Sequence, residues 1–380
     1  MRKIRLDLGK RSYDIVVCYN KISELGSHIK HLKLGTDALI ITNPVIKRLL
    51  GGKIKKSLLG AGFNVKIATV PDSEKAKSEK YCLGLLNSIS KFDSTSRRIF
   101  IIAMGGGVIG DLAGFAASIY RRGIPYIHVP TTLLAQVDSA IGGKVAIDLR
   151  VGKNLAGAFY QPRLVFSDAA LLKTLPKKDL ISGLGEIVKY GIIKSPQLFS
   201  FLEKNYRKIL GRDKKALEYV IHACSLIKAR VVEKDEHDNK NIRVALNLGH
   251  TIGHAIETAA HYGKSYSHGQ AIALGTIAAS CISRELGLLD EKSFLRIKNL
   301  IKKIGLPVTL KGLNIKAIFK AQEHDKKFIH GKNRLVLPVR IGKTVVKENI
   351  PKPVIINSIE SLLSFPRKPA ALPLGRRESI

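Results

Sequence analysis

Short hydrophobic runs alternate with longer amphipathic segments through the first half of the chain. The runs are rich in β-branched residues and occupy positions 14–17, 38–42, 64–70, 98–103 and 126–129. The segments at 44–59 and 78–91 lie between such runs and have the patterning of helices. This alternation predicts a parallel sheet that is covered by helices on both faces.

The pattern changes after about residue 175, where long helical segments replace the short runs. The segments occupy positions 178–191, 214–233, 250–260, 268–286 and 291–303. Residues 334–350 have the pattern of a β-hairpin that turns around 341–343. From residue 365 onwards the chain is rich in proline and arginine, and we expect this tail to be disordered.

Composition indicates a soluble globular protein with about two domains. The chain has 380 residues, of which 45% are hydrophobic and 25% are charged. No apolar segment resembling a secretory signal opens it, and the longest apolar stretch, 99–120, contains three consecutive glycines and Asp111. We therefore expect no membrane span. The cysteines are scattered without a CxxC pair, so we expect a reducing cytoplasm and no disulfide framework: they are Cys18, Cys82, Cys224 and Cys281.

The formal net charge of +34 is the unusual feature of the composition. Such a charge attracts nucleic acid, anionic lipid or anionic small molecules. No long basic block or RNA-binding signature accompanies it, and lysines occur on most predicted helical faces. Solvated surface charge that also favours an anionic substrate is therefore a better interpretation than a nucleic-acid-binding module.

A glycine-rich turn follows one of the predicted strands. Gly105, Gly106 and Gly107 come directly after the run at 98–103, and Gly105, Gly107 and Gly110 have the GxGxxG spacing. Glycines here let the backbone approach a pyrophosphate at a helix N-terminus. A tight strand-to-helix turn without a ligand explains the same residues, so the pattern alone is a weak signal.

The turn also departs from the usual dinucleotide fingerprint. It follows about the fourth predicted strand, and the next strand is not followed by an acid that could hold the ribose. Other polar residues at the carboxyl ends of predicted strands are candidates for this contact: Asn43, Glu74, Lys77 and Asp111.

Histidines and a glutamate indicate a metal site in the second half. His250 and His254 are four residues apart on one predicted helix, and His268 opens the next helix. Glu186 lies on an earlier helix. Two histidines and a carboxylate form the ligand set of a catalytic zinc site with an open position. Spacing alone does not decide which three of these four residues bind the ion.

Cationic residues accompany this group in settings that suit an anion. Glycine next to a lysine permits close approach to an anion, as at Gly143–Lys144 and in Gly152–Lys153–Asn154. The other polar residues of this kind are Asp138, Lys189, Lys228, Arg243, Lys326 and Lys327. Together the motifs indicate NAD, a divalent metal and a polyanionic substrate.

We therefore expect an α/β fold with two domains and a cleft between them. Residues 1–175 would form an N-terminal Rossmann-like parallel-sheet nucleotide domain. Residues 176–364 would form a mostly α-helical C-terminal domain for the metal and the substrate, and 365–380 the disordered tail.

The chain resembles the 3-dehydroquinate synthase family over about residues 10–345. The stretches that carry the resemblance are GGGVIGDLAGF (105–115), RGIPYIHVPTTLLAQVDSAIGGKVAID (122–148), GKNLAGAFYQP (152–162), LGEIVKYG (184–191), LNLGHTIGHAIE (246–257), SHGQAIALG (267–275), DKK (325–327) and GKNRLVLP (331–338). Several of them are long and specific to the family.

The resemblance implies a role for each candidate residue. Glu186, His250 and His268 would hold zinc or cobalt, and His254 would face the substrate. Arg122 would reach the substrate phosphate across the interface of a homodimer. The implied substrate contacts are Asp138, Lys144, Lys153, Asn154, Lys189, Lys228, Arg243, Asn247, Lys326 and Lys327. The implied NAD contacts are Asn43, Glu74, Lys77, Gly105, Gly106, Gly107, Asp111, Thr131, Thr132, Lys144, Lys153 and Thr174.

Three departures from the family pattern are visible. Ser73 precedes Glu74 where the family has glycine, and Gln270 stands where it has glutamate. The stretch 235–243 is one residue longer than usual, which makes Lys228 the least secure of the implied contacts.

The implied reaction converts 3-deoxy-D-arabino-heptulosonate 7-phosphate into 3-dehydroquinate and phosphate, a step of the shikimate pathway to aromatic amino acids. It combines transient oxidation by NAD, phosphate elimination, reduction and aldol cyclisation, and it makes the protein a phosphate-eliminating lyase. Two alternatives are a related sugar phosphate cyclase and a metal-dependent NAD polyol dehydrogenase. The dehydrogenase would release NADH and would not require so many substrate cations.

Overall fold

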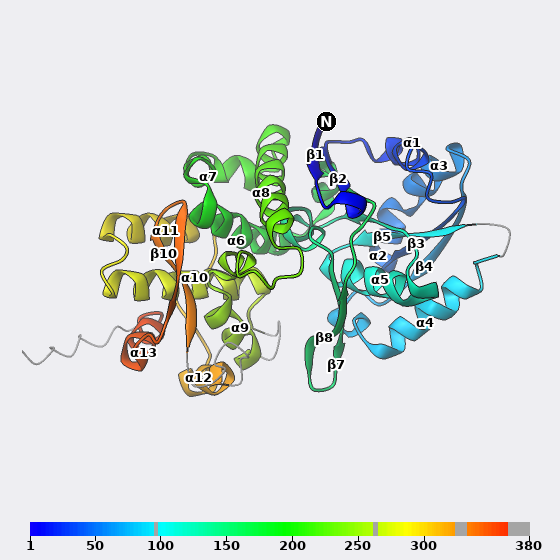
Figure 1. The fold of residues 1–380 in the computed structure, drawn as a ribbon. Helices are drawn as coiled ribbons and strands as arrows, with labels where there is room; N and C mark the ends of the chain where they lie inside the picture. Colours follow the sequence, from blue (N-terminus) through cyan, green and yellow to red (C-terminus); the bar gives the residue numbers. More distant parts are fainter. Residues whose placement is uncertain (95–97, 261–264, 324–332, 364–380) are drawn as a thin grey trace, which may run out of the picture.

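The computed structural model describes residues 1–94, 98–260, 265–323 and 333–363. Its elements form a sheet half, up to about residue 175, and a helical half that follows it (Figure 1). The strands are β1 (Arg2–Leu6), β2 (Tyr13–Cys18), β3 (Asp37–Thr42), β4 (Asn64–Thr69), β5 (Ile99–Gly105), β6 (Tyr126–Pro130), β7 (Lys144–Leu149), β8 (Gly152–Phe159), β9 (Leu164–Asp168), β10 (Arg334–Arg340) and β11 (Lys343–Glu348).

The helices are α1 (Leu25–Lys30), α2 (Pro44–Ile46), α3 (Gly52–Gly60), α4 (Glu79–Ser90), α5 (Gly107–Ile119), α6 (Lys177–Lys194), α7 (Pro196–Leu210), α8 (Lys214–Lys234), α9 (His250–Ala259), α10 (His268–Glu285), α11 (Glu291–Ile304), α12 (Ile315–Glu323) and α13 (Lys352–Glu360). The longest helices, α6, α8 and α10, all belong to the helical half. Of the described residues, no helix is long and apolar enough to cross a membrane.

The sheet has the strand order β1-β2-β9-β6-β5-β3-β4. Every pairing in it is parallel except that of β1 with β2, which is antiparallel. The predicted strands at 14–17, 38–42, 64–70, 98–103 and 126–129 are all confirmed as members of this sheet. The sequence interpretation did not include β1 and β9, so the sheet is wider than expected and mixed at one edge.

Side chains of alternate strand residues point to opposite faces, and each face has its own core. Ile40 of β3 packs with residues of α1 and α3, whereas its neighbours Leu39 and Ile41 pack with residues of α4 and α5. Figure 1 shows these two helix pairs on opposite sides of the sheet. The predicted coverage of both faces is thereby confirmed.

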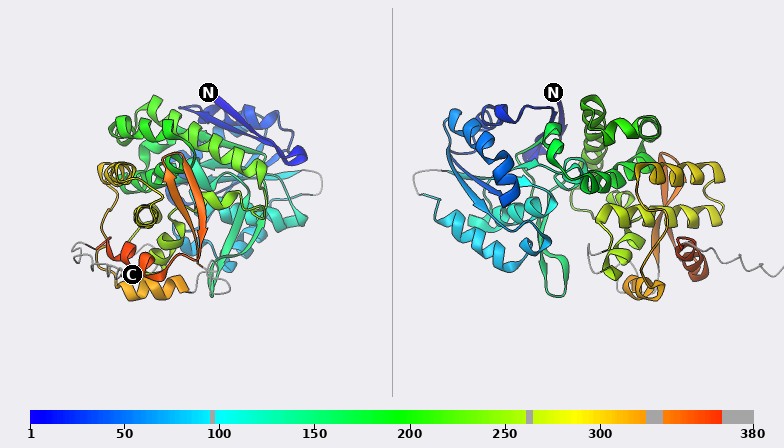
Figure 2. Two further views of the ribbon diagram at one scale, coloured as in Figure 1. Left: turned by 60° about the vertical axis from the view of Figure 1, so that its left-hand side comes forward. Right: turned by 180° about the vertical axis from the view of Figure 1, so that it is seen from behind.

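The hairpin of β7 and β8 extends away from the sheet, and the views in Figure 2 show the same arrangement. The motif analysis placed Lys144 and Asn154 near an anion without predicting these strands. The polar and glycine-rich composition of 142–157 hides the strand pattern. The later hairpin, β10 with β11, agrees with the prediction at 334–350.

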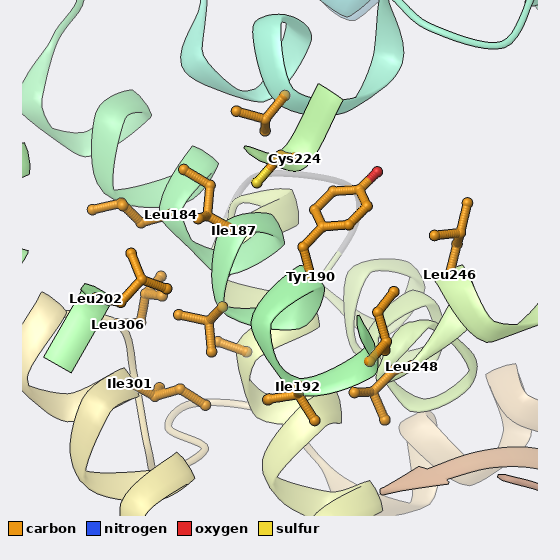
Figure 3. Packing of buried hydrophobic residues seen from close by; sticks show 14 of the residues in the cluster. Leu184, Ile187, Tyr190, Ile192, Leu202, Cys224, Leu246, Leu248, Ile301 and Leu306 are labelled. Atoms are coloured by element: carbon orange, nitrogen blue, oxygen red, sulfur yellow. The ribbon is translucent and has the colours of Figure 1, made fainter. Parts of the chain in front are cut away.

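Helix α6 is the centre of the helical half. Its residues from Leu184 to Ile193 are buried on every side of the helix. Figure 3 shows Leu184, Ile187 and Tyr190 pointing into the core from this helix, near Cys224 of α8. A helix buried all round can carry polar residues only where other groups offset the cost of their burial.

Glycines let α6, α9 and α10 pack at backbone distance. A Cβ atom on Gly269 of α10 would lie 1.9 Å from the Ser182 carbonyl oxygen of α6. A Cβ atom on Gly275 would lie 2.0 Å from the carbonyl oxygen of Gly249, which precedes α9. We call these contacts the glycine seam. No other residue type fits at such a distance, so the seam fixes the spacing of the three helices.

Candidate active site

Three helices bring a carboxylate and two imidazoles together. Glu186 comes from α6, and His250 and His268 are the first residues of α9 and α10. The Nε2 atoms of His250 and His268 lie 3.6 Å and 3.3 Å from Glu186 Oε1. The three residues form a group that could hold a metal ion, as the sequence interpretation expected.

The surroundings of Glu186 fit a bound cation. Its side chain is fully buried, and among the described residues neither carboxylate oxygen has a donor in hydrogen-bonding geometry. The buried ammonium of Lys189 lies beside it, one helical turn further along α6. Burial raises the pKa of Glu186, but the charges of Lys189 and the two histidines outweigh burial and hold that pKa well below its usual range. The carboxylate is therefore ionised and available as a ligand.

A cavity of about 520 Å³ opens beside this group. It is formed by the β7–β8 hairpin, by Asp111 and the segment 138–141 of the sheet half, and by parts of the helical half. Residues of the expected substrate set that line it are Asp138, Lys144, Asn154, Lys189, Lys228, Arg243, Asn247 and His254, and the expected metal ligands that line it are His250 and His268. The cavity thus combines several cations with the imidazoles of the metal group, which suits an anionic ligand.

Asp138 anchors one wall of the cavity. Its carboxylate contacts the Lys228 ammonium and accepts a hydrogen bond of 3.0 Å from the Tyr190 hydroxyl. Burial raises the pKa of Asp138, but the charges of Lys228 and Lys189 outweigh it and lower that pKa to about 2. Lys228 was the least secure of the contacts implied by the resemblance, because of the longer loop at 235–243. The structure places it in the lining of the cavity.

The loop from 235 to 243 is held by one buried carboxylate. Asp235 accepts hydrogen bonds from four backbone N–H groups in this loop, at 3.0 to 3.1 Å. This fixes Arg243, whose guanidinium donates to the Glu236 carbonyl oxygen at 2.8 Å. Asp238 of the same loop contacts Lys144 of the hairpin at 2.5 Å. The extra residue is thus accommodated without moving Arg243 out of the cavity.

A second cavity, of about 410 Å³, lies at the glycine-rich turn. The expected cofactor residues that line it are Asn43, Glu74, Gly106, Gly107, Thr131, Thr132 and Thr174. They come from the segments that follow the carboxyl ends of parallel strands and from the start of α5, the edge at which sheets of this kind bind ligands. A Cβ atom on Gly106 would lie 3.1 Å from the Thr132 methyl group.

The other glycines of the turn have a packing role. A Cβ atom on Gly105 would lie 2.5 Å from the Ile109 side chain, and one on Gly110 would lie 2.1 Å from the ring of His128. The glycines of this turn therefore divide into two pairs, since Gly106 and Gly107 face the cavity whereas Gly105 and Gly110 permit close packing.

Lys77 and Asp111 lie between the hairpin and the glycine-rich turn. The buried Lys77 ammonium contacts the Asp111 carboxylate at 2.7 Å and also meets the side chain of Asn154. Burial raises the pKa of Asp111 to about 6, although Lys77 opposes the shift. Asp111 and Asn154 line the larger cavity, whereas Lys77, an expected cofactor contact, lines neither of the two cavities described.

Some expected residues do not line either described cavity. Lys153 lies on β8 and contacts Glu74 at 3.0 Å. Arg122 is exposed at the end of a 3-10 turn (Tyr120–Arg122), with a left-handed φ of 61°. Lys326 and Lys327 lie outside the described residues.

The sequence interpretation missed several residues of the site. Asp238, Leu155 and Phe159 line the larger cavity, and Asp179 and Ser182 line the smaller one. Only the hairpin and loop geometry brings most of them to the site. Glu257 is different, because it follows His250 and His254 by seven and three residues and thus lies on the same face of α9. This helical spacing could have identified Glu257 from the sequence as a neighbour of the two histidines.

Two family models together match residues 67–328 of the chain. Residues 67–182 match the 3-dehydroquinate synthase N-terminal family, and residues 183–328 match the 3-dehydroquinate synthase C-terminal family. The 3-dehydroquinate synthase of Desulforamulus reducens is 44% identical over 352 residues, which cover 92% of this chain and 97% of the relative.

Solved structures resemble the chain over a similar length. A 2-deoxy-scyllo-inosose synthase complexed with carbaglucose-6-phosphate, NAD⁺ and Co²⁺ has a TM-score of 0.86 and 28% identity, covering 95% of this chain and all of that one. The 2-epi-5-epi-valiolone synthase of Streptomyces hygroscopicus subsp. jinggangensis, with NAD⁺ and Zn²⁺, has a TM-score of 0.84 and 25% identity, covering 94% and 98%. Given the two family matches and the identity to the Desulforamulus enzyme, this chain belongs to the 3-dehydroquinate synthase family.

Proposed function

We propose that the protein is a 3-dehydroquinate synthase, which converts 3-deoxy-D-arabino-heptulosonate 7-phosphate into 3-dehydroquinate and phosphate. One observation carries the proposal: the two histidines of the Glu–His–His group and four cations line the same cavity. The cations are Lys144, Lys189, Lys228 and Arg243. A substrate with a carboxylate at one end and a phosphate at the other requires several cations, and the relatives that bear this name support the assignment.

The two cofactors would bind at the two cavities. NAD would lie at the glycine-rich turn, as its presence in similar cyclases supports, and would accept a hydride from the substrate and later return it. A divalent zinc or cobalt ion held by Glu186, His250 and His268 would act as a Lewis acid toward the substrate's hydroxyl groups.

The chain's own cations position the substrate and stabilise charge. Lys144, Lys228 and Arg243 would contact its anionic groups. Hydrogen bonds to backbone carbonyl oxygens already hold the Lys228 and Arg243 side chains in place before the substrate arrives. When the phosphate leaves, negative charge moves onto the departing oxygen, and nearby cations lower the energy of that state. Asp138 maintains the orientation of Lys228 through their contact.

His254 is the residue best placed to exchange protons. Its side chain is half exposed on α9 and lines the cavity beside the metal group. An imidazole can accept and release a proton near neutral pH, which enolisation and ring opening both require. We therefore assign His254 to proton transfer and not to metal binding.

The two halves would act as the NAD domain and as the metal and substrate domain, within a homodimer in the cytoplasm. The exposed position of Arg122, away from both described cavities, supports a role in the partner's site. This residue and two neighbours, Arg121 and Gly123, have left-handed φ angles of 61°, 48° and 123°, so the turn holds Arg122 in an unusual backbone conformation.

The decisive experiment supplies excess heptulosonate phosphate with zinc and a small amount of NAD. Phosphate and 3-dehydroquinate should accumulate over many turnovers without matching NADH, because the hydride returns to the same substrate. Stoichiometric NADH without phosphate would instead identify a polyol dehydrogenase. Turnover of carboxylate-free sugar phosphates, with none of the heptulosonate phosphate, would identify a related cyclase.

A further inference from the structure

The two imidazoles of the metal group have the same orientation. His250 directs Nε2 toward Glu186, and its Nδ1 lies 3.2 Å from the carbonyl oxygen of Leu248. His268 also directs Nε2 toward Glu186, and its Nδ1 lies 3.2 Å and 3.3 Å from the two carboxylate oxygens of Glu257. An acceptor faces each Nδ1 atom, so with an ion bound the ring proton would lie on Nδ1 and the Nε2 atom, which points toward Glu186, would be the ligand.

The acceptors differ in charge. A backbone carbonyl orients His250, whereas a full carboxylate orients His268. A carboxylate that accepts the Nδ1 proton fixes the ring and also makes the opposite nitrogen a stronger electron donor. His268 therefore receives the stronger support of the two histidines.

We propose that Glu257 is a positioning residue for the metal site, which holds the His268 ring in its ligating orientation. The inference rests on the proposed function, because it assumes that Glu186, His250 and His268 bind a divalent ion. Nothing in it requires Glu257 to touch the metal or the substrate.

Other contacts already fix the backbone around His268, so only the orientation of its imidazole ring depends on Glu257. Ser267 and Gln270 form a capping box at the start of α10. The Gly269 N–H group donates to the Ser182 hydroxyl at 3.1 Å, and the glycine seam locks this turn against α6. Rotation of the imidazole about its side-chain bonds would still remove Nε2 from the site, and the contact with Glu257 opposes that rotation.

Glu257 reaches this position from the neighbouring helix. It lies in the last turns of α9, and its side chain is 15% exposed. His254, on the preceding turn, has its Nε2 atom 4.0 Å from the same carboxylate. Glu257 thus connects the proposed proton-transfer residue with a proposed ligand.

The same three side chains suggest one competing arrangement. His254, Glu257 and His268 are close enough to hold an ion of their own. That arrangement would use His268 Nδ1 as a ligand, and a nitrogen that binds metal cannot donate a proton to Glu257. The two readings therefore predict different zinc stoichiometries.

The test measures zinc binding to metal-free protein by competition with a chromophoric chelator. Wild type, Glu257→Ala and Glu257→Gln are compared with Glu285→Gln, which makes the same chemical change at the exposed end of α10. We expect Glu257→Ala to bind zinc about 10- to 100-fold more weakly. Glu257→Gln should lose less, because its amide oxygen can still accept the Nδ1 proton, and the control should match wild type.

The visible absorption of the cobalt-substituted proteins gives a second readout, since it responds to ligand orientation and not to fold stability. It should change in both Glu257 variants, so Glu257→Gln alone decides the matter if Glu257→Ala does not fold. Unchanged zinc affinity and an unchanged cobalt spectrum in Glu257→Gln and Glu257→Ala would overturn the inference and leave the proposed function standing. Two zinc ions per wild-type chain would overturn it in favour of the second site. A wild-type chain that binds no divalent ion would remove the metal-dependent function itself.

Discussion

Glu186 carries a negative charge in a fully buried position, which is tolerated only because cationic and imidazole groups surround it. In this structure Lys189, His250 and His268 all lie against it. In the proposed site this residue would provide the charge that attracts a metal ion, and the two histidines would complete the ligand set.

Removing one imidazole tests that assignment. We expect His250→Ala to lose most of its bound zinc and nearly all activity, because only two of the three ligands would remain. Metal content of the purified variant, measured against His31→Ala at an exposed site, checks the prediction. Stoichiometric zinc in the folded His250→Ala protein would show that the ligand assignment is wrong.

A second prediction concerns His128 and the dependence of the protein's stability on pH. It lies buried on β6 beneath Gly110, its Nε2 atom has no hydrogen-bond partner among the described residues, and burial lowers its pKa to about 4. At pH values above its ordinary pKa of about 6.5, the ring is neutral in both the folded and the unfolded chain, so it contributes no pH dependence to the stability. As the pH falls from there toward 4, only the unfolded chain takes up the proton, so stability is lost.

The loss from His128 should amount to about 2 kcal/mol between pH 7.5 and pH 5. Urea unfolding of the metal-free protein at the two pH values would measure it. His128→Leu should lose less stability than wild type over this range, whatever its stability at pH 7.5. Identical pH dependence in the two proteins would exclude His128 as the source.

At the level of single residues, the sequence predicted most of the site but not the way in which it is held. Histidine spacing and the motifs around Lys144 and Arg243 identified groups that do line one cavity. Asp238 and Phe159 were not predictable, because no local pattern marks a residue that a loop or hairpin carries to the cavity. Glu257 was predictable from its helical spacing and was overlooked.

The turn between β5 and α5 is the element in which sequence and structure agree most closely. Its strand, its glycines and its helix lie where the sequence placed them, because hydrophobic periodicity and glycine placement are both local properties. The β7–β8 hairpin and strands β1 and β9 were missed, since their pairing partners are distant or their composition is polar.

This turn provides a prediction about NAD. Gly106→Val should weaken NAD binding at least about tenfold, because the added side chain would occupy the space over the start of α5. Fluorescence titration with NADH would measure the effect, and circular dichroism would confirm that the variant is folded. An unchanged affinity would leave the turn with a packing role alone.

The glycine seam gives a matched pair of substitutions. Gly269→Ala would place a methyl group 1.9 Å from a backbone oxygen, so we expect a loss of at least about 1–3 kcal/mol of stability and weaker zinc binding. Gly84→Ala, within α4, meets nothing within 4 Å and should be neutral or stabilising by up to about 1 kcal/mol. Thermal unfolding compares the two, and equal effects would remove the seam's proposed importance.

At the scale of the whole molecule, one chain does not bring all the expected substrate contacts to its own cavity. Among the described residues, Arg122 is exposed and contributes to neither cavity, although the family resemblance places it near a partner's phosphate. In a symmetric homodimer of this kind, each chain would contribute its Arg122 to the active site of the other chain.

Mixing two inactive variants tests the arrangement. Arg122→Ala and Lys228→Ala should each be nearly inactive, but after joint refolding in equal amounts about a quarter of the wild-type activity should return. The recovery is expected because each mixed dimer contains one site with both residues intact. Recovery far below this value, in dimers shown to exchange subunits, would place Arg122 in its own chain's site.

The glycine seam has a consequence for how this architecture diversifies. The spacing of the proposed metal ligands is set by backbone contacts among α6, α9 and α10, whereas the cations that would select a substrate lie on the β7–β8 hairpin, on α8 and on the loop 235–243. Mutation can therefore alter the hairpin and the loop without disturbing the ion. We therefore expect cyclases for other sugars to keep the glycine seam and to differ from this chain mainly in the hairpin and the loop.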